Sequence, residues 1–284
     1  MERVVPMPIR NEETVNLKQK RGRQMKKNKK LSTEKKITII TVAIILIAWC
    51  IVTGAGLVDT SLLPTPVAVW QAFIEIATNG YKGFTLLQHI GASMYRLLVS
   101  FVLATIVAVP LGLLSGTSSK FRAVLGPIIE FYRPLPPLAY YTLLVLALGI
   151  ENESKIALLF LACFAPIYIQ CTSAVLRVKK DYINSAYTLG ATKKQVFAKV
   201  IFPSCLPDIF VGLRTALGVG YTTLVAAEMV AASSGLGWLV LDASNYLRYD
   251  IIFMGIIIMS ATGILLNGII LFVENRVVPW KGKD

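Results

Sequence analysis

Long apolar stretches alternate with short polar segments along almost the whole chain. Six of these stretches are long enough to cross a bilayer as helices, because about 20 residues at about 1.5 Å each span a hydrocarbon core of about 30 Å. They occupy residues 37–57, 97–116, 134–150, 156–176, 209–232 and 251–273. Backbone groups in lipid must be hydrogen-bonded within their own segment, so the pattern predicts an all-α integral membrane protein with six spans.

The segment 134–150 is the shortest of the six and begins with three prolines, Pro134, Pro136 and Pro137. They cannot all lie inside one regular helix, since each lacks an amide donor and crowds the preceding turn. Two interpretations remain open. The prolines either break the helix where it lines a water-filled cavity, or they mark a helix that starts at the membrane surface.

One polar, basic stretch, residues 177–208, interrupts the second half of the chain between two apolar spans. Its order predicts a helical hairpin: a helical run to Leu189, a break at Gly190 and Ala191, and a second run from Thr192, followed by two prolines. A helix–glycine–helix hairpin on the membrane surface favours a docking site for another protein. A second surface element is expected in residues 62–80, where a proline-punctuated turn precedes a short amphipathic helix.

Composition and charge support a membrane location and give it a direction. The chain of 284 residues is 55% hydrophobic and only 16% charged. Residues 1–36, 117–133, 177–204 and 274–284 together hold 24 of the 29 Lys and Arg residues. Basic residues favour the cytoplasmic side, which predicts that both termini are cytoplasmic. The net charge of +13 therefore reports topology rather than nucleic-acid binding. Residues 1–36 form a basic cytoplasmic tail in this interpretation, and residues 37–284 form the membrane domain.

Two charged residues lie within predicted spans, and a third borders one. Arg214 and Glu228 occupy opposite ends of the span 209–232, and Arg96 enters the span 97–116 at a depth similar to that of Glu228. An unpaired carboxylate at that depth is costly, so we expect Arg96 and Glu228 to lie close together. The pair serves either the structure or the passage of a solute, and the structural role is favoured.

The sequence carries no recognisable catalytic or metal-binding motif. A G-x-x-x-x-G-K-[ST] phosphate loop and a Rossmann fingerprint are both absent, His89 is the only histidine, and the acidic residues are scattered. These features disfavour a membrane enzyme. A secondary transporter is also disfavoured, because ionisable residues at the centre of the membrane are missing.

Within the hairpin, NSAYTLGATKKQVFAKVIFP fits the pattern E-A-A, three residues, G, nine residues, I-x-L-P. This pattern resembles the cytoplasmic loop signature of permease subunits of binding-protein-dependent ABC importers. The stretches RLLVSFVLATIVAVPLGLLSG and PDIFVGLRTALGVGYTTLVAAEM resemble the nitrate/sulfonate/taurine branch, and YRPLPPLAY and VVPWKGK are most similar to its taurine permeases. The Glu of the signature is replaced by Asn184 and its first Ala by Ser185.

The resemblance implies a type I ABC importer permease domain of six helices that has no catalytic residue, metal or cofactor of its own. ATP and Mg²⁺ would be bound by separate ABC ATPase subunits, which receive the hairpin. An extracytoplasmic solute-binding protein and a second permease copy, forming a homodimer in the bacterial inner membrane, are the other implied partners. Taurine or a related alkanesulfonate is the implied cargo, and nitrate, a pyrimidine or thiamine precursor, and riboflavin are the alternatives.

Two sets of residues carry these expectations. The hairpin residues expected to couple to the ATPase are Asn184, Ser185, Ala186, Gly190, Ala191, Val200, Phe202 and Pro203. The residues expected to line the path or support it are Arg96, Pro134, Pro136, Pro137, Arg214 and Glu228. Phe197, Val200 and Phe202 are expected to anchor the second helix of the hairpin to the membrane bundle.

Overall fold

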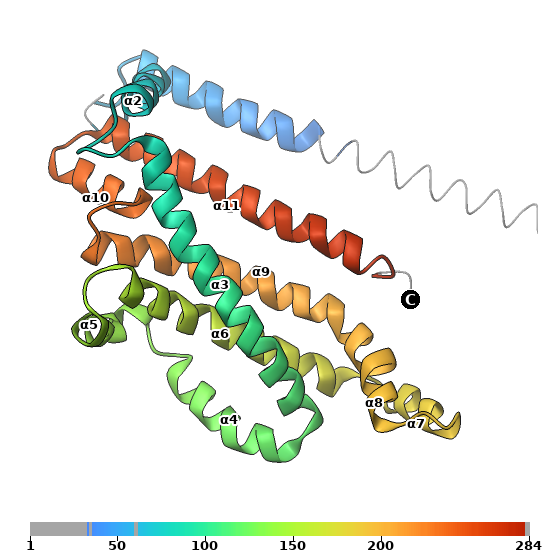
Figure 1. Cartoon of the computed structure of the whole chain (residues 1–284). Helices are drawn as coiled ribbons and strands as arrows, with labels where there is room; N and C mark the ends of the chain where they lie inside the picture. Colours follow the sequence, from blue (N-terminus) through green and yellow to red (C-terminus); the bar gives the residue numbers. More distant parts are fainter. Residues whose placement is uncertain (1–32, 34–35, 60–61, 282–284) are drawn as a thin grey trace, which may run out of the picture. The chain divides into compact units, whose positions relative to one another are not determined.

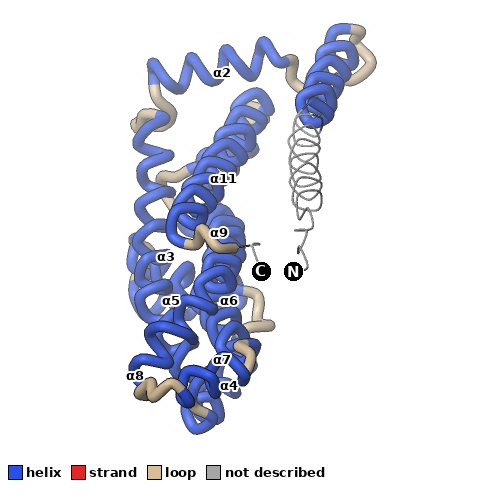
Figure 2. Tube along the Cα trace, turned by 90° about the vertical axis from the view of Figure 1, so that its right-hand side faces the viewer, coloured by secondary structure: helices blue, strands red, loops and turns tan. Residues whose placement is uncertain are grey.

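The structure is a computed structural model that describes residues 33, 36–59 and 62–281. All regular elements in these residues are helices (Figures 1 and 2). The predicted basic tail, 1–36, lies outside the described residues except for Thr33 and Lys36. The chain divides into two compact units, Met1–Pro66 and Val67–Asp284, which are described separately.

The first unit contains one apolar helix, Lys36–Gly54, whose 19 residues are long enough to cross a membrane. This helix corresponds to the predicted span 37–57. Near its end the indole Nε1 of Trp49 donates a hydrogen bond of 3.1 Å to the carbonyl oxygen of Pro64. The bond ties the following loop to the last turns of the helix.

The second unit holds the remaining helices, of which the first begins at its boundary. They are α2 (Pro66–Asn79), α3 (Leu86–Thr117), α4 (Ser119–Tyr132), α5 (Pro137–Leu148), α6 (Asn152–Arg177), α7 (Lys180–Thr188), α8 (Lys193–Val196), the π-helical segment η1 (Phe197–Ile201), α9 (Phe202–Ala231), α10 (Leu236–Asn245) and α11 (Tyr249–Val277). Four of them, α3, α6, α11 and the continuous run Lys193–Ala231, are long and apolar enough to span a membrane.

Helix α6 is the centre of this unit and packs against both α3 and α9 (Figure 1). Small residues allow the close approach: a Cβ atom on Gly112 of α3 would lie 2.6 Å from Cβ of Cys171, and one on Gly220 of α9 would lie 2.5 Å from Sγ of Cys163. Both cysteines are fully buried. Small residues at helix contacts are typical of membrane bundles, where close packing replaces hydrophobic collapse.

Helix α3 is longer than the predicted span 97–116 because it starts at Leu86. Thr85 begins it with a capping box, in which the Thr85 hydroxyl accepts from the amide of Gln88 and the Gln88 side chain accepts from the amide of Thr85. The predicted span omits these first turns because they mix polar and apolar residues. Pro110 lies inside α3 without ending it.

The predicted span 134–150 is shorter in the structure, where α5 covers only Pro137–Leu148. Twelve residues of helix reach about 18 Å, which is less than the hydrocarbon thickness of about 30 Å. The preceding segment, between the predicted spans 97–116 and 134–150, is helical and forms α4, with Ile129 in the core. The third predicted crossing is therefore reduced to α5, which follows α4, because the prolines between the two helices prevent one continuous helix.

Helix α2 confirms the predicted amphipathic surface helix. It runs across the end of α3: Figure 1 shows it end-on, and Figure 2 shows it nearly at right angles to α3. Val69, Ala72 and Ile76 form its buried face. Glu75 on α2 pairs with Arg248, the residue before α11, at 2.8 Å. The pair fastens this surface helix to the end of the bundle.

Candidate functional site

The hairpin 177–208 lies at the opposite end of the bundle from α10 (Figure 1). Its first helix, α7, ends in a Schellman motif. The amide of Gly190 donates to the carbonyl of Tyr187 at 2.9 Å, and the amide of Ala191 donates to the carbonyl of Ala186 at 3.1 Å. Gly190 has φ +83°, a left-handed conformation that favours glycine. The predicted break at Gly190 is therefore confirmed as a helix stop.

The second helix of the hairpin starts directly after this stop. Thr192 and Gln195 form a capping box: the Thr192 amide donates to Gln195 Oε1 at 2.8 Å, and the Gln195 amide donates to Thr192 Oγ1 at 3.4 Å. The two helices are thus separated by only a few residues, 189–192, whose backbone amides all donate to nearby groups. This arrangement produces a tight turn of defined shape rather than a variable loop.

After α8 the chain continues as helix through η1 into α9, so the second helix of the hairpin is joined rigidly to a membrane span. The amide of Phe202 donates to the carbonyl of Phe197, one residue beyond the α-helical partner. Pro203 follows immediately and has no amide donor, which accounts for the local change in helical pitch. A movement of the hairpin can therefore pass directly into α9.

The tip of the hairpin presents apolar side chains to its surroundings. The side chain of Leu189 is 88% exposed, and Tyr187 is 45% exposed. Asn184 and Ser185 are exposed on the same helix, and a Cβ atom on Gly190 would meet nothing within 4 Å. Leu189 and Tyr187 at the open glycine turn leave apolar surface that a partner protein can cover.

The predicted anchors of the hairpin are corrected in part. Phe197 packs against the core as expected, but Val200 is only half-buried and Phe202 is 36% exposed. Val196 is the buried anchor, with 1% exposure, and Ile201 packs beside Phe197. The π-helical turn displaces the sequence register by one residue, which a regular helical pattern does not predict.

At the other end of the bundle, Arg96 and Glu228 form a buried ion pair with 2.7 Å between Nη1 and Oε1, so their predicted proximity is confirmed. Their exposures are 5% and 0%. Both oxygens of Glu228 accept from Ser93, and Oε2 also accepts from the amide of Gly237 at 2.9 Å. Arg96 Nε donates to Oδ1 of Asn152 at 2.7 Å. The pair thus links α3, α6, α9 and the first turn of α10.

This turn, residues 232–235, is held by residues whose importance the sequence did not reveal. The amide of Gly235 donates to Nδ1 of His89 at 3.2 Å, and Nε2 of His89 lies 3.3 Å from the carbonyl of Tyr81. The His89 ring stacks on Trp238 with centroids 5.7 Å apart. A Cβ on Gly235 would collide with the carboxylate of Glu228. Because these partners are far apart in the chain, only the fold brings them together.

The loop before α3 forms a polar cluster at the same end. The hydroxyl of Tyr81 donates to Asp242 at 2.9 Å, and Lys82 donates to the hydroxyl of Tyr246 at 3.0 Å. Burial and the hydrogen bond to Asp242 raise the pKa of Tyr81, so it stays neutral at physiological pH.

The remaining predicted path residues lie apart from this ion pair. Pro136 precedes α5 and Pro137 is its first residue, while Pro134 lies in the turn after α4. Arg214 of α9 lies toward the hairpin end and pairs with Glu274 of α11, with 3.6 Å between Nη1 and Oε2. Lys281 also pairs with Glu274, whose side chain is 2% exposed. The sequence did not indicate Glu274 as a partner for Arg214.

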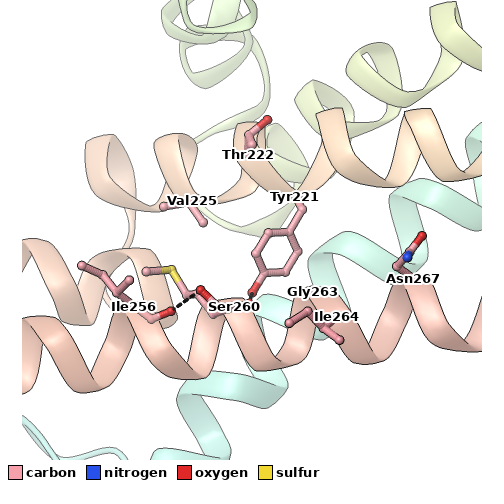
Figure 3. Close-up of a pocket in the computed structure, with 9 residues that line it drawn as sticks. Tyr221, Thr222, Val225, Ile256, Ser260, Gly263, Ile264 and Asn267 are labelled. Carbon is pink, nitrogen blue, oxygen red and sulfur yellow. Dashed lines mark hydrogen bonds between the residues drawn. The ribbon is translucent and has the colours of Figure 1, made fainter. Parts of the chain in front are cut away.

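An open groove of about 660 Å³ lies between α9 and α11 (Figure 3). Tyr221 of α9 crosses toward α11, where its hydroxyl donates to the carbonyl of Met259 at 2.8 Å. The polar side chains of Thr222, Ser260 and Asn267 also line this groove. Polar groups and a glycine, Gly263, along a groove between two spans are typical of a surface that another helix or a polar solute meets.

Among the described residues, no three His, Cys, Asp or Glu side chains are grouped so that they could hold a metal ion.

Comparison with known proteins places this geometry in a family. Residues 108–279 match the family described as "Binding-protein-dependent transport system inner membrane component". The taurine transport system permease protein TauC of Escherichia coli K12 is 39% identical over 263 residues, which cover 92% of this chain and 96% of that protein. The nitrate import permease protein NrtB of Synechocystis is 33% identical over 252 residues, covering 86% and 90%.

A solved structure has a similar fold. An inward-facing structure of the MetNI methionine ABC transporter aligns with a TM-score of 0.56 and 18% sequence identity, covering 68% of this chain and 94% of that chain. At this identity the similarity shows the type I permease fold alone.

Proposed function

The chain belongs to the family of inner membrane components of binding-protein-dependent transport systems, and from this premise we propose that it forms the transmembrane path by which taurine or a related alkanesulfonate is imported. The chain is a multi-pass permease subunit of an ABC importer. The observation that carries the cargo assignment is the 39% identity to a taurine permease over 92% of the chain. The 33% identity to a nitrate permease makes nitrate the second candidate.

The energy for import comes from separate ABC ATPase subunits, which bind ATP and Mg²⁺, and the chain itself has no catalytic residue. In this proposal the hairpin transmits force from the ATPase subunits to the membrane helices. Its support is geometric: exposed Leu189 and Tyr187 at the tip, and a helix that continues from Lys193 to Ala231 without a loop. Closure of two ATPase subunits would tilt α9 through this connection. The coupling residues are those named above, with Asn184, Ser185, Ala186, Gly190 and Ala191 at the tip.

The orientation follows from the same assignment. The hairpin end faces the cytoplasm, together with both termini, and the end with α2 and α10 faces outward. An extracytoplasmic solute-binding protein delivers cargo to the outer end. The distribution of basic residues supports this arrangement, since 177–204 alone holds six of them.

A second copy of the chain completes the path as a homodimer. The groove between α9 and α11 supports this step, because Thr222, Ser260 and Asn267 would face lipid in a single copy. Covering the groove with a second copy would give these groups polar surroundings. Arg96 and Glu228 support the outer end of the path as a structural pair, since Glu228 already accepts hydrogen bonds from Ser93, Arg96 and Gly237.

The test is uptake by the full chain in proteoliposomes with its ATPase and solute-binding partners. We expect ATP-dependent accumulation of labelled taurine that unlabelled taurine or a short alkanesulfonate competes away and nitrate does not. Competition by nitrate alone would overturn the cargo assignment and leave the importer assignment intact. Accumulation that does not require the ATPase subunit would overturn the importer mechanism.

A further inference from the structure

A pocket of about 460 Å³ lies at the base of the hairpin, where α6 ends and α9 begins. We call it the basal pocket and define it by Arg177, Lys179, Tyr182, Lys199, Asp208 and Trp280. Its volume is within the range of small-ligand sites, about 300–1,000 Å³. It is separate from the hairpin tip and from the Arg96–Glu228 pair, and of its lining residues only Val200 and Pro203 belong to the proposed coupling residues.

The charge of the basal pocket is positive. Arg177 is neutralised by Asp208, with 3.1 Å between Nη2 and Oδ1. Among the residues that the structure describes, Lys179 and Lys199 have no carboxylate within ion-pair distance. Both lysines are exposed, and the ammonium of Lys179 lies 5.7 Å from the ring centroid of Tyr182. Two ammonium groups without a carboxylate partner, in a pocket that Tyr182 also lines, form an anion-binding surface.

The rest of the lining is apolar apart from Ser204, and the pocket lies where candidate membrane spans end. Val200, Pro203 and Pro207 line it from the start of α9, and Trp280 covers it from the segment after α11. Three membrane spans, α6, α9 and α11, therefore end around this site. Tryptophan is enriched at the level of lipid headgroups, and basic pockets between span ends bind anionic headgroups.

We propose that the basal pocket binds the phosphate of an anionic phospholipid, with Lys179, Lys199 and the Tyr182 hydroxyl around the phosphate and the glycerol and upper acyl carbons against Pro203, Pro207 and Trp280. A free phosphate ion offers the same charge but leaves the apolar wall without a partner. The apolar wall therefore selects the lipid. A lipid held here would brace the hairpin against the ends of α6 and α9.

The test uses the purified full-length chain and native mass spectrometry after exposure to phosphatidylglycerol or phosphatidylcholine. We expect the wild type to retain phosphatidylglycerol and to lose phosphatidylcholine. The double variant Lys179→Gln/Lys199→Gln should retain phosphatidylglycerol about tenfold less well, because each lysine near the surface attracts an anionic headgroup. All four lysines concerned in this test and its control are exposed, so the variants retain the fold.

The matched control is Lys180→Gln/Lys194→Gln, which removes the same charge from the same hairpin outside the basal pocket. It should change retention by less than about twofold. Equal losses in the two double variants would mean that only the overall charge attracts lipid, and no loss in either would exclude the site. Displacement of phosphatidylglycerol from the wild type by millimolar inorganic phosphate would assign the pocket to the free ion instead. None of these outcomes depends on which solute is transported.

Discussion

At the scale of single residues, the end of the bundle near α10 depends on a charge pair that the protein itself isolates from water. Arg96 and Glu228 are both buried, and the neighbouring Ser93, Asn152 and Gly237 use their remaining hydrogen-bonding capacity. Removing one member of a buried pair is far more costly than removing both, because it leaves an uncompensated charge. This asymmetry separates a structural pair from a solute-binding one.

Glu228→Gln should lower the free energy of unfolding of the detergent-solubilised chain by about 3–5 kcal/mol, because Arg96 keeps its charge but loses its carboxylate partner. The double variant Arg96→Met/Glu228→Met should recover most of that loss. The measurement is the midpoint temperature of unfolding, monitored as the loss of the folded peak in size-exclusion chromatography after heating. A single variant that unfolds like the wild type but no longer transports would show that the pair acts on the solute.

Gly190 has a conformational role, not a packing role, because a Cβ there would meet no neighbour but φ is +83°. We expect Gly190→Val to insert normally but to uncouple ATP hydrolysis from uptake, since the left-handed conformation costs a β-branched residue about 1–2 kcal/mol or more. Gly190→Asn should retain most of the coupling, because asparagine tolerates this conformation. Equal transport by the wild type and the Val variant would refute the claim that the hairpin couples ATP hydrolysis to transport.

At the scale of elements, local signals predicted the hairpin well. Gly190 and Thr192 end one helix and start the next through hydrogen bonds to residues close in sequence. These helix boundaries can therefore be predicted from the sequence without knowledge of the fold. The sequence pattern missed the π-helical turn and the burial of Val196, because it assumes a regular helical register. The prolines between α4 and α5 predicted the break between these helices, but the sequence pattern did not predict α4 itself.

The capping box gives an element-scale prediction. Thr192→Ala should destabilise the start of the second hairpin helix by about 0.5–2 kcal/mol and reduce the uptake per ATP hydrolysed. Thr188→Ala is the matched control, because the Thr188 hydroxyl only donates to the carbonyl of Asn184 in the preceding turn. Coupling ratios that fall equally in both variants would mean that the cap does not set the hairpin shape.

At the scale of the whole molecule, hydropathy and charge predicted the class of fold, because the number and length of apolar segments are properties of the chain alone. They did not predict which helices pack together. His89, Trp238 and Glu274 have partners far away in sequence, and nothing local marks them. The polar groove between α9 and α11 likewise exists only after the two spans pack.

This groove tests the proposed second copy. With Cys50 replaced by serine, the chain's other native cysteines, Cys163, Cys171 and Cys205, are buried, so a single Ser260→Cys can report contacts between copies. We expect a disulfide-linked dimer on oxidation in membranes. Ile264→Cys, in the same groove, should also cross-link, whereas Leu87→Cys at the outer end of α3, 79% exposed, should not. Cross-linking only from Leu87 would place the contact between copies elsewhere.

The central claim is that the hairpin receives force from an ATP-hydrolysing partner in the cytoplasm. A photo-reactive benzophenone residue at Leu189, the exposed tip of the hairpin, tests it most directly, with Tyr246 at the outer end as the control site. On illumination of the assembled complex in membranes, we predict a cross-link between this chain and the ATPase subunit from position 189 and none from position 246. No ATPase adduct from position 189, or an adduct from position 246, would contradict the account.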